Sequence, residues 1–222
     1  MKPYKLKSEE ASIVFVGSFN PAIFHPEWLL RHQLITHDDI KGAKVEIIHV
    51  DISKFTLEWL AVDVLRHKFT IRTNDPSRFA PLKDLMISVF KILDHTPIKQ
   101  LGINLTSTYE IDTEENWHKI GDILVPKAIW EKSLPKRVGM TLLTVRSERS
   151  DSLDGDINVR ISPIKEGFYG VDFSVNNHIK LQSDQEKEET IDVPTILSNN
   201  WDVAIEMARN IGNTTLSNII GT

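Results

Sequence analysis

A long run of alternating apolar and polar residues extends from Phe55 to Arg72. Its apolar members recur at every second position over most of its length and are Phe55, Leu57, Trp59, Ala61, Leu65, Phe69 and Ile71. A period of two predicts a strand with one buried face, because successive side chains leave an extended backbone in opposite directions. The run is longer than the usual strand, so we expect a bend near Asp63 or a division into two strands.

Other segments of the first half have equally clear patterns. Short strands are predicted at 12–17, 44–52 and 101–111, the second with a bulge between Ile47 and Ile48 where its apolar phase changes. Helices are predicted at 25–35 and 79–95, the latter from its apolar spacing of three and four. Residues 10–111 therefore have the ferredoxin-like order β-α-β-β-α-β, in which two helices cover one face of an antiparallel sheet.

The second half, residues 112–222, predicts a three-strand meander followed by a C-terminal helix. The three alternating runs are 138–145, 157–161 and 169–175. The last helix is expected at 199–210, with Gly212 placed to end it, and it follows a charged loop at 182–189. Two short helical stretches are expected around Trp117 and Trp130. The fold class is therefore α+β with largely antiparallel sheets, in a single domain over 1–222 whose sub-halves are 10–111 and 112–222.

Charge and cysteine content narrow the classes of function. The 26 basic residues are outnumbered by 31 acidic ones, giving a net charge of -5, which argues against broad binding of nucleic acid or anionic membrane. The chain contains no cysteine, so disulfide scaffolds and cysteine nucleophiles are excluded and a cytoplasmic location is the simpler expectation. Its polar beginning lacks a signal-peptide core, and no apolar run is long enough to span a bilayer.

One turn carries candidate chemistry for an enzyme. Gly17-Ser18-Phe19-Asn20-Pro21 follows the first predicted strand and resembles the opening motif of the nucleotidylyltransferases. That resemblance implies phosphate binding at a helix N-terminus, with Ser18, Asn20 and His25 as binding residues. The family's His-x-Gly-His segment is absent here, and only His25 could take its place. The alternative interpretation is a strand-to-helix turn formed by glycine, asparagine and proline.

Two further groups of side chains are candidate binding residues. Arg146, Arg149 and Arg160, with Arg137 nearby, could form a basic stripe on the second-half meander that holds phosphate, nucleic acid or an acidic partner. Interleaved acids favour cross-strand ion pairs as the alternative. A polar row, Asn104, Thr106, Thr108 and Glu110, is typical of a half-exposed strand or of a partner-binding sheet.

Metal binding is not expected. His25, His32 and His37 lie seven and five residues apart, whereas ligands on one helix face lie three or four apart. His32 is expected to be a partly buried packing residue. No metal and no cofactor are therefore assigned.

Three short segments resemble an uncharacterised, sporadically distributed bacterial family of α+β proteins. They are Leu101-Gly102-Ile103-Asn104, Thr144-Val145-Arg146-Ser147 and Asn158-Val159-Arg160-Ile161. The resemblance implies a similar fold and no catalytic residues. With no coherent catalytic group in view, we expect a non-catalytic binding or assembly module whose partner is a second copy or another protein. A nucleotide-using transferase and a nucleic-acid-contacting module are the alternatives.

Overall fold

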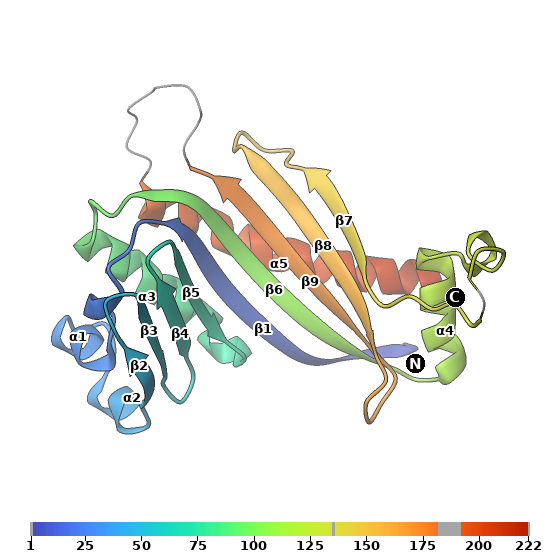
Figure 1. Cartoon of the computed structure of the whole chain (residues 1–222), viewed down its shortest axis with the longest axis horizontal. Coiled ribbons are helices and arrows are strands. Elements are labelled where there is room, and N and C mark those ends of the chain that lie inside the picture. Colours follow the sequence, from blue (N-terminus) through green and yellow to red (C-terminus); the bar gives the residue numbers. More distant parts are fainter. Residues whose placement is uncertain (1, 135, 182–191, 222) are drawn as a thin grey trace.

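The structure is a computed structural model that describes residues 2–134, 136–181 and 192–221. Within these residues one open antiparallel sheet has the strand order β2-β3-β4-β5-β1-β6-β9-β8-β7 (Figure 1). The strands are β1 (Tyr4–Gly17), β2 (Lys44–Ile48), β3 (Ile52–Thr56), β4 (Ala61–Leu65), β5 (Lys68–Thr73), β6 (Ile98–Ile111), β7 (Leu143–Glu148), β8 (Gly155–Ile164) and β9 (Gly170–Lys180). The predicted α+β class and its antiparallel sheet are confirmed.

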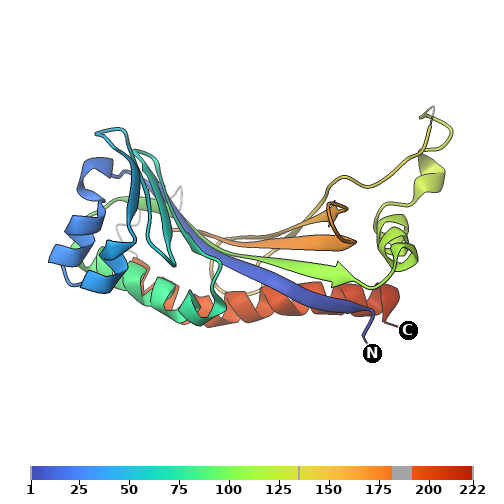
Figure 2. The same ribbon diagram turned by 90° about the horizontal axis from the view of Figure 1, so that it is seen from below.

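Helices cover only one face of this sheet. The helices are α1 (Pro26–Arg31), α2 (His37–Lys41), α3 (Phe79–Ile92), α4 (Glu114–Leu124) and α5 (Val193–Ile220), with 3₁₀ turns η1 (Pro21–Ile23), η2 (Pro76–Arg78) and η3 (Lys127–Ile129). Figure 2 shows α3 and α5 beneath the sheet, while α1, α2 and α4 lie at its two ends. None of the helices in the described residues lies over the centre of the opposite face, which we call the open face.

Side-chain alternation on the two central strands explains why one face is covered. On β1 the positions Ala11, Ile13 and Phe15 are buried, and β6 places Leu105, Ile103 and Leu101 directly opposite them. These residues form the sheet side of the main hydrophobic cluster, and residues of α3 and α5 form its other side. A second, smaller cluster surrounds Tyr109 near the far ends of β6 and α5. The apolar phase of the strands therefore selects the face that the helices cover.

The two halves of the chain repeat one arrangement. Each begins with a long strand, β1 or β6, and continues through helical segments into an antiparallel meander. In each half the last strand of the meander returns beside the first, so β5 pairs with β1 and β9 pairs with β6. A helix on the covered face then follows. The first meander has four strands, where a ferredoxin-like unit has a two-strand hairpin, so the ferredoxin-like order is not confirmed.

The run from Phe55 to Arg72 is divided, but over three strands instead of the two expected, and the prediction that the backbone at Trp59 belongs to a strand is wrong. Residues 52–73 form three strands, because the chain turns at 57–60, where the amide of Leu57 donates to the carbonyl of Leu60, and again at 66–67. The first turn shifts the buried phase, so Leu60 is buried and Trp59 is not. The indole of Trp59 instead donates to Asp39 in α2 across 2.8 Å.

Two other first-half elements are shorter than predicted. The helix expected at 25–35 is only the six-residue α1, because Gln33 has a φ of 58° and ends the helix, and α2 is a separate helix beyond the predicted range. The strand expected at 44–52 becomes β2, a turn, and the start of β3. Its register shift lies between Val45 and Ile47, close to the predicted bulge.

The C-terminal helix is much longer than predicted. α5 continues through Gly212, which is buried against the ring of Tyr109. A β-carbon at Gly212 would lie 2.9 Å from the Tyr109 hydroxyl, so glycine serves here for close approach and not as a helix end. The three-strand meander, β7 to β9, is confirmed. The predicted loop at 182–189 lies outside the described residues.

A buried ion pair joins α5 to β1. Glu9 lies two residues before Ala11 in the continuous register of β1 against β6, so its side chain faces the covered side, where it is buried. The carboxylate of Glu9 accepts hydrogen bonds from Arg209 Nε at 2.9 Å and Nη2 at 2.6 Å. The hydroxyl of Ser107 on β6 donates to the same carboxylate across 3.3 Å. The hydrogen bonds to Glu9 raise the pKa of Arg209, so the guanidinium stays charged.

Candidate binding surfaces

The floor of the open face is lined by uncharged polar side chains. Ser12, Asn104, Asn176 and Asn158 occupy directly opposed positions on four neighbouring strands, β1, β6, β9 and β8. The amide of Asn104 donates to the hydroxyl of Ser12 across 3.1 Å. The floor therefore presents amide donors and acceptors, and the raised ends of the molecule flank it (Figure 2).

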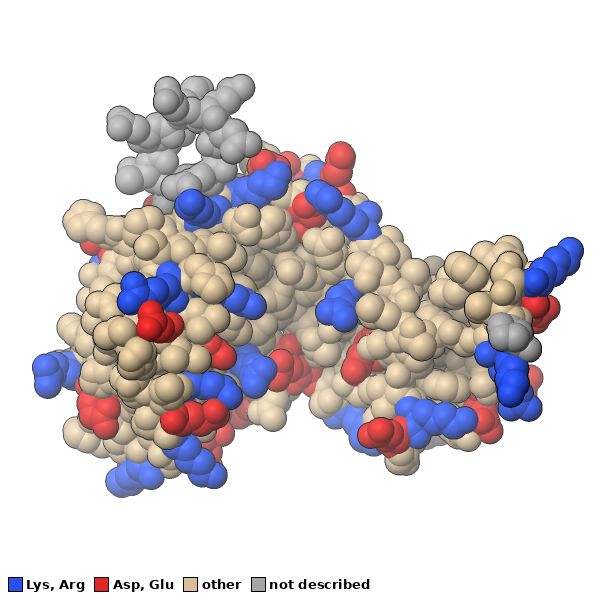
Figure 3. Space-filling view, viewed as in Figure 1, with Lys and Arg blue, Asp and Glu red and all other residues tan. Residues whose placement is uncertain are grey.

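Hydroxyl and carboxylate groups continue this polar floor along β6 and β9. The hydroxyls of Thr106 and Ser174 lie 2.8 Å apart, and Thr108 donates to Asp172 across 2.6 Å. Figure 3 shows basic and acidic side chains interspersed over this face, which is hollowed between its two ends. The predicted polar row on β6 is thus half-exposed, and much of its hydrogen-bonding capacity is used by the neighbouring strand.

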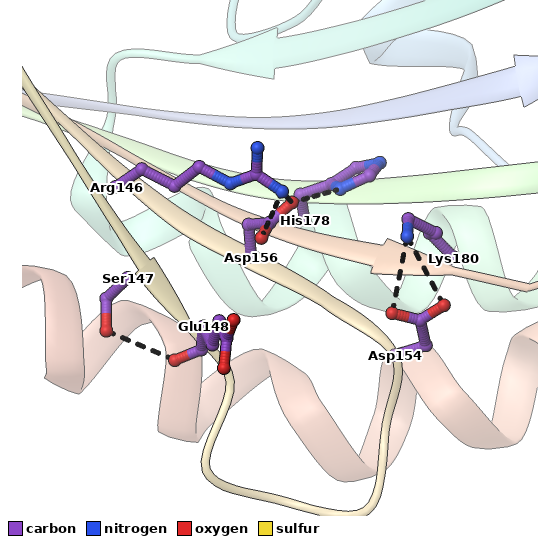
Figure 4. Close-up of polar contacts among 7 residues, drawn as sticks. All are labelled: Arg146, Ser147, Glu148, Asp154, Asp156, His178 and Lys180. Atoms are coloured by element: carbon purple, nitrogen blue, oxygen red, sulfur yellow. Dashed lines mark hydrogen bonds and ion pairs between the residues drawn. The ribbon is translucent and has the colours of Figure 1, made fainter.

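An ion cluster lies on the open face where β7, β8 and β9 run side by side (Figure 4). Arg146 Nη2 lies 2.6 Å from the carboxylate of Asp156, and His178 Nδ1 lies 3.9 Å from it. Burial lowers the pKa of His178, although the Asp156 carboxylate acts in the opposite direction. Lys180 and Arg146 also lower this pKa, so the imidazole is neutral near neutral pH.

This cluster has the geometry of cross-strand pairing. Asp156 and His178 are directly opposed in the register of β8 and β9. Their 3.9 Å separation is too long for a hydrogen bond that would orient the imidazole as a general base. The hydroxyl of Ser147, whose register partner Ile157 packs on the covered side, donates to the carbonyl of Glu148, 3.1 Å away (Figure 4). The arrangement neutralises charge on the sheet surface.

The structure divides the predicted arginine stripe between the two faces of the sheet. Arg146 and Arg160 lie on the open face, since their register partners Asn158 and Ser174 do. Arg149 follows β7 and turns to the covered side, where it donates to Asn177 and to Asp151. Its side chain is only 6% exposed. The three arginines therefore do not form one surface. Arg146 forms a cross-strand ion pair with Asp156, as the alternative interpretation predicted, whereas Arg149 pairs with Asp151 within the loop that follows β7.

The residues of the Gly17–Pro21 turn are separated in a similar way. Ser18 and Asn20 line a shallow groove of about 380 Å³ beside residues 92–97, at the C-terminal end of α3. His25 is not among the lining residues. Its imidazole accepts a hydrogen bond from the amide of Trp28, 3.2 Å away, and so begins α1. The lining includes Asp94 and His95 but no lysine or arginine.

The histidines of the predicted helix lie at the surface. His32 is exposed, contrary to the prediction, and its ring centre lies 4.6 Å from that of Trp28. In the part of the chain that the structure describes, no group of three or more histidine, aspartate or glutamate side chains is placed to hold a metal ion.

Exposed hydrophobic side chains gather in two segments. Of thirteen large hydrophobic residues exposed in the described chain, nine lie at 45–50 and 123–142. The first group, which we call the edge patch, is Val45, Ile47, Ile48 and Val50, on or beside the edge strand β2. The second group includes Ile129, Trp130 and Leu134 on residues 125–134, which we call the arm. Contiguous exposed apolar surface of this kind marks interaction sites.

A groove runs along one flank of α5. It has a volume of about 580 Å³ and is lined by Val203, Glu206, Met207, Asn210, Ile211, Thr214 and Thr215. These residues recur at intervals of three and four, so they share one side of the helix. α5 contacts β6 and β9, and Met207 in the groove accepts a hydrogen bond of 3.7 Å from the amide of Asn177 on β9. We call this surface the α5 groove.

Sequence reasoning missed both the arm and the α5 groove as binding surfaces. A signal for the arm is present in the sequence, where Ile129 and Trp130 stand beside lysines between Pro126 and Pro135. The sequence contains no such signal for the α5 groove. The residues on that side of α5 would have the same pattern if another helix or strand covered them.

A scan against family models gives no match for this chain, and a search of curated proteins gives none either. None of the helices in the described ranges is long and apolar enough to cross a membrane.

Proposed function

We propose that the chain is a non-catalytic binding and assembly module that associates with further copies of itself. The observation that carries this proposal is the concentration of exposed apolar side chains at the two ends of the sheet. Burial of such side chains against a partner is favourable by roughly 25 cal/mol per Å² of apolar surface. The charged groups of the open face are largely paired with one another, which supports a binding role over a catalytic one.

Light scattering coupled to size-exclusion chromatography tests the proposal. A self-associating module gives a mass above that of one chain, and the mass rises with protein concentration because association follows mass action. A mass of one chain at every concentration overturns the proposal.

The alternative function, a nucleotide-using transferase built on Ser18, Asn20 and His25, makes a different prediction. Nucleoside triphosphates should then raise the melting temperature, because a ligand that binds the native state stabilises it. Asn20→Ala should abolish that rise. We expect no rise for the wild-type protein, because the groove beside Asn20 contains the acidic Asp94 and lies at the negative end of the α3 dipole.

A further inference from the structure

The arm projects from the body of the protein and presents apolar side chains to solvent. It begins after α4 and rises at one end of the sheet, on the side of the open face (Figure 2). Its backbone forms helical turns, with the amide of Leu134 bonded to the carbonyl of Trp130 across 3.0 Å. Ile129 is 68% exposed and Trp130 is 43% exposed. Tryptophan is enriched among the few residues that contribute most of the binding free energy of protein interfaces.

The arm and the three residues that follow it are together basic, although the chain as a whole is acidic. Residues 125–137 contain four cations and one anion, in a chain whose net charge is -5. Lys127 is paired with Asp122 at 2.5 Å, whereas no ion pair involves Lys132 among the described residues. A partner for the arm should therefore combine apolar surface with negative charge.

The α5 groove has this combination. Its apolar members are Val203, Met207 and Ile211, and Val203 is 60% exposed. Glu206 is the charged lining residue, and none of the lining residues is a lysine or arginine. Asp202 lies on the preceding turn with its side chain exposed, and its only ion pair among the described residues is a long one to Lys83, at 3.9 Å. The groove is thus apolar with an acidic border.

We propose that the arm of one copy docks in the α5 groove of a second copy, with Trp130 and Leu134 against Met207 and Ile211. This inference rests on the proposed function and names the two surfaces through which the copies associate. The arm rises on the open-face side of the sheet, whereas α5 lies on the covered side (Figure 2). A chain therefore does not reach its own groove, and the occupant comes from another molecule. The basic arm and acidic groove supply complementary charge.

The two surfaces differ from each other, so the contact is heterologous. A pair joined by one such contact leaves one arm and one groove free, and association continues until a ring closes or a row forms. Two copies that exchange arms reciprocally close as a two-fold dimer. Pairing between the exposed edge strands β2 or β7 would instead use the same surface on both copies and would not involve the arm.

Cross-linking between single-cysteine variants tests the contact directly, because the natural chain has no cysteine. Ala128→Cys places a thiol on the arm and Asn210→Cys places one in the groove. A short bismaleimide should join a mixture of these two variants. The matched control replaces Asn210→Cys with Glu58→Cys, an exposed position in the turn between β3 and β4. Equal cross-linking in both mixtures, or none in either, overturns the arm-to-groove contact.

Charge exchange and truncation give a second, independent measurement. Lys132→Glu and Glu206→Lys should each weaken association a few-fold, and a mixture of the two variants should recover it. Trp130→Ser should weaken association by about 30-fold or more if this side chain is a centre of the interface. Circular dichroism of each variant verifies that it is folded.

The possible failures are distinguishable. If the wild-type protein is oligomeric and Trp130→Ser leaves the oligomer unchanged, the arm-to-groove contact is wrong and the proposed function stands. If the wild-type protein is a monomer at every concentration, both are wrong. Binding of the wild-type protein, but not of Trp130→Ser, to phosphatidylserine vesicles without cross-linking between copies would overturn the contact and assign the arm to a membrane surface.

Discussion

Removal of Arg209 should destabilise the protein far more than removal of a surface arginine. Glu9 is 4% exposed, and its carboxylate is held by two nitrogens of Arg209. Arg209→Leu leaves a buried carboxylate without a counter-charge, which costs about 3–5 kcal/mol in a fully buried site. The Arg209 side chain is 41% exposed, so water reaches the vacated space and reduces the cost. We expect a loss of about 2–3 kcal/mol.

The adjacent residue on β1 supplies a matched control. Glu10 lies on the open face and pairs with Arg72 at 4.0 Å, with both side chains exposed. Arg72→Leu should therefore change stability by less than about 0.5 kcal/mol. The double variant Glu9→Gln/Arg209→Leu should recover most of the loss, because it removes the buried charge together with its partner.

Urea denaturation followed by circular dichroism measures these differences. In a chain of this length, about 1 kcal/mol corresponds to a change of about 2–4 °C in melting temperature, so Arg209→Leu should melt about 4–12 °C lower. Equal effects of Arg209→Leu and Arg72→Leu would show that Glu9 is solvated and not buried on the covered side. A double variant less stable than Arg209→Leu would contradict the explanation based on an unpaired buried charge.

Other parts of the molecule give further predictions. Gly212→Ala should lower stability by about 1–3 kcal/mol, because its β-carbon would press on the ring of Tyr109. Gly139→Ala should leave stability unchanged, because no atom lies within 4 Å of the position of its β-carbon. Thermal unfolding measures both variants. Folding lowers the pKa of His178 from its ordinary value of 6.5. The contribution of the neutral imidazole to stability is therefore complete above pH 6.5 and is lost as the pH falls through the folded-state pKa. His178→Gln should remove this part of the pH dependence of stability, as measured by urea titration at several pH values. If the open face bound nucleic acid, affinity would fall steeply with salt and Arg160→Ala would reduce the slope; we expect no binding to a fluorescent oligonucleotide at physiological salt.

Elements with one buried face were predictable from the sequence. α3, β6 and β9 each bury one side, and the spacing of their apolar residues in the sequence matches that side. The three-strand meander followed from the same rule. Each of these segments occupies a position where local preference and tertiary packing agree.

The failures arose where packing overrides local pattern. The alternation through Trp59 is typical of a strand, yet a four-residue turn interrupts it, because Leu60 rather than Trp59 enters the core. Gly212 has the sequence character of a helix end, but its role depends on Tyr109, more than one hundred residues earlier in the chain. A sequence pattern does not reveal which distant side chain needs that space.

The candidate sites were less predictable than the fold. Sequence proximity suggested that Arg146, Arg149 and Arg160 act together, but Arg149 turns to the opposite side of the sheet. The groove of α5 could not be predicted, because it exists only where no neighbouring element covers that helix flank. Binding surfaces depend on what is left uncovered, and the sequence pattern alone records only what is apolar.

Sedimentation velocity of the wild-type protein beside Trp130→Ser/Leu134→Ser, over a range of concentrations, is the most direct test of self-association. Arm-to-groove association predicts that the wild-type sedimentation coefficient rises with concentration above that of a single chain. The double variant should sediment as a single chain over the same range. A wild-type protein that sediments as one chain throughout would contradict the account.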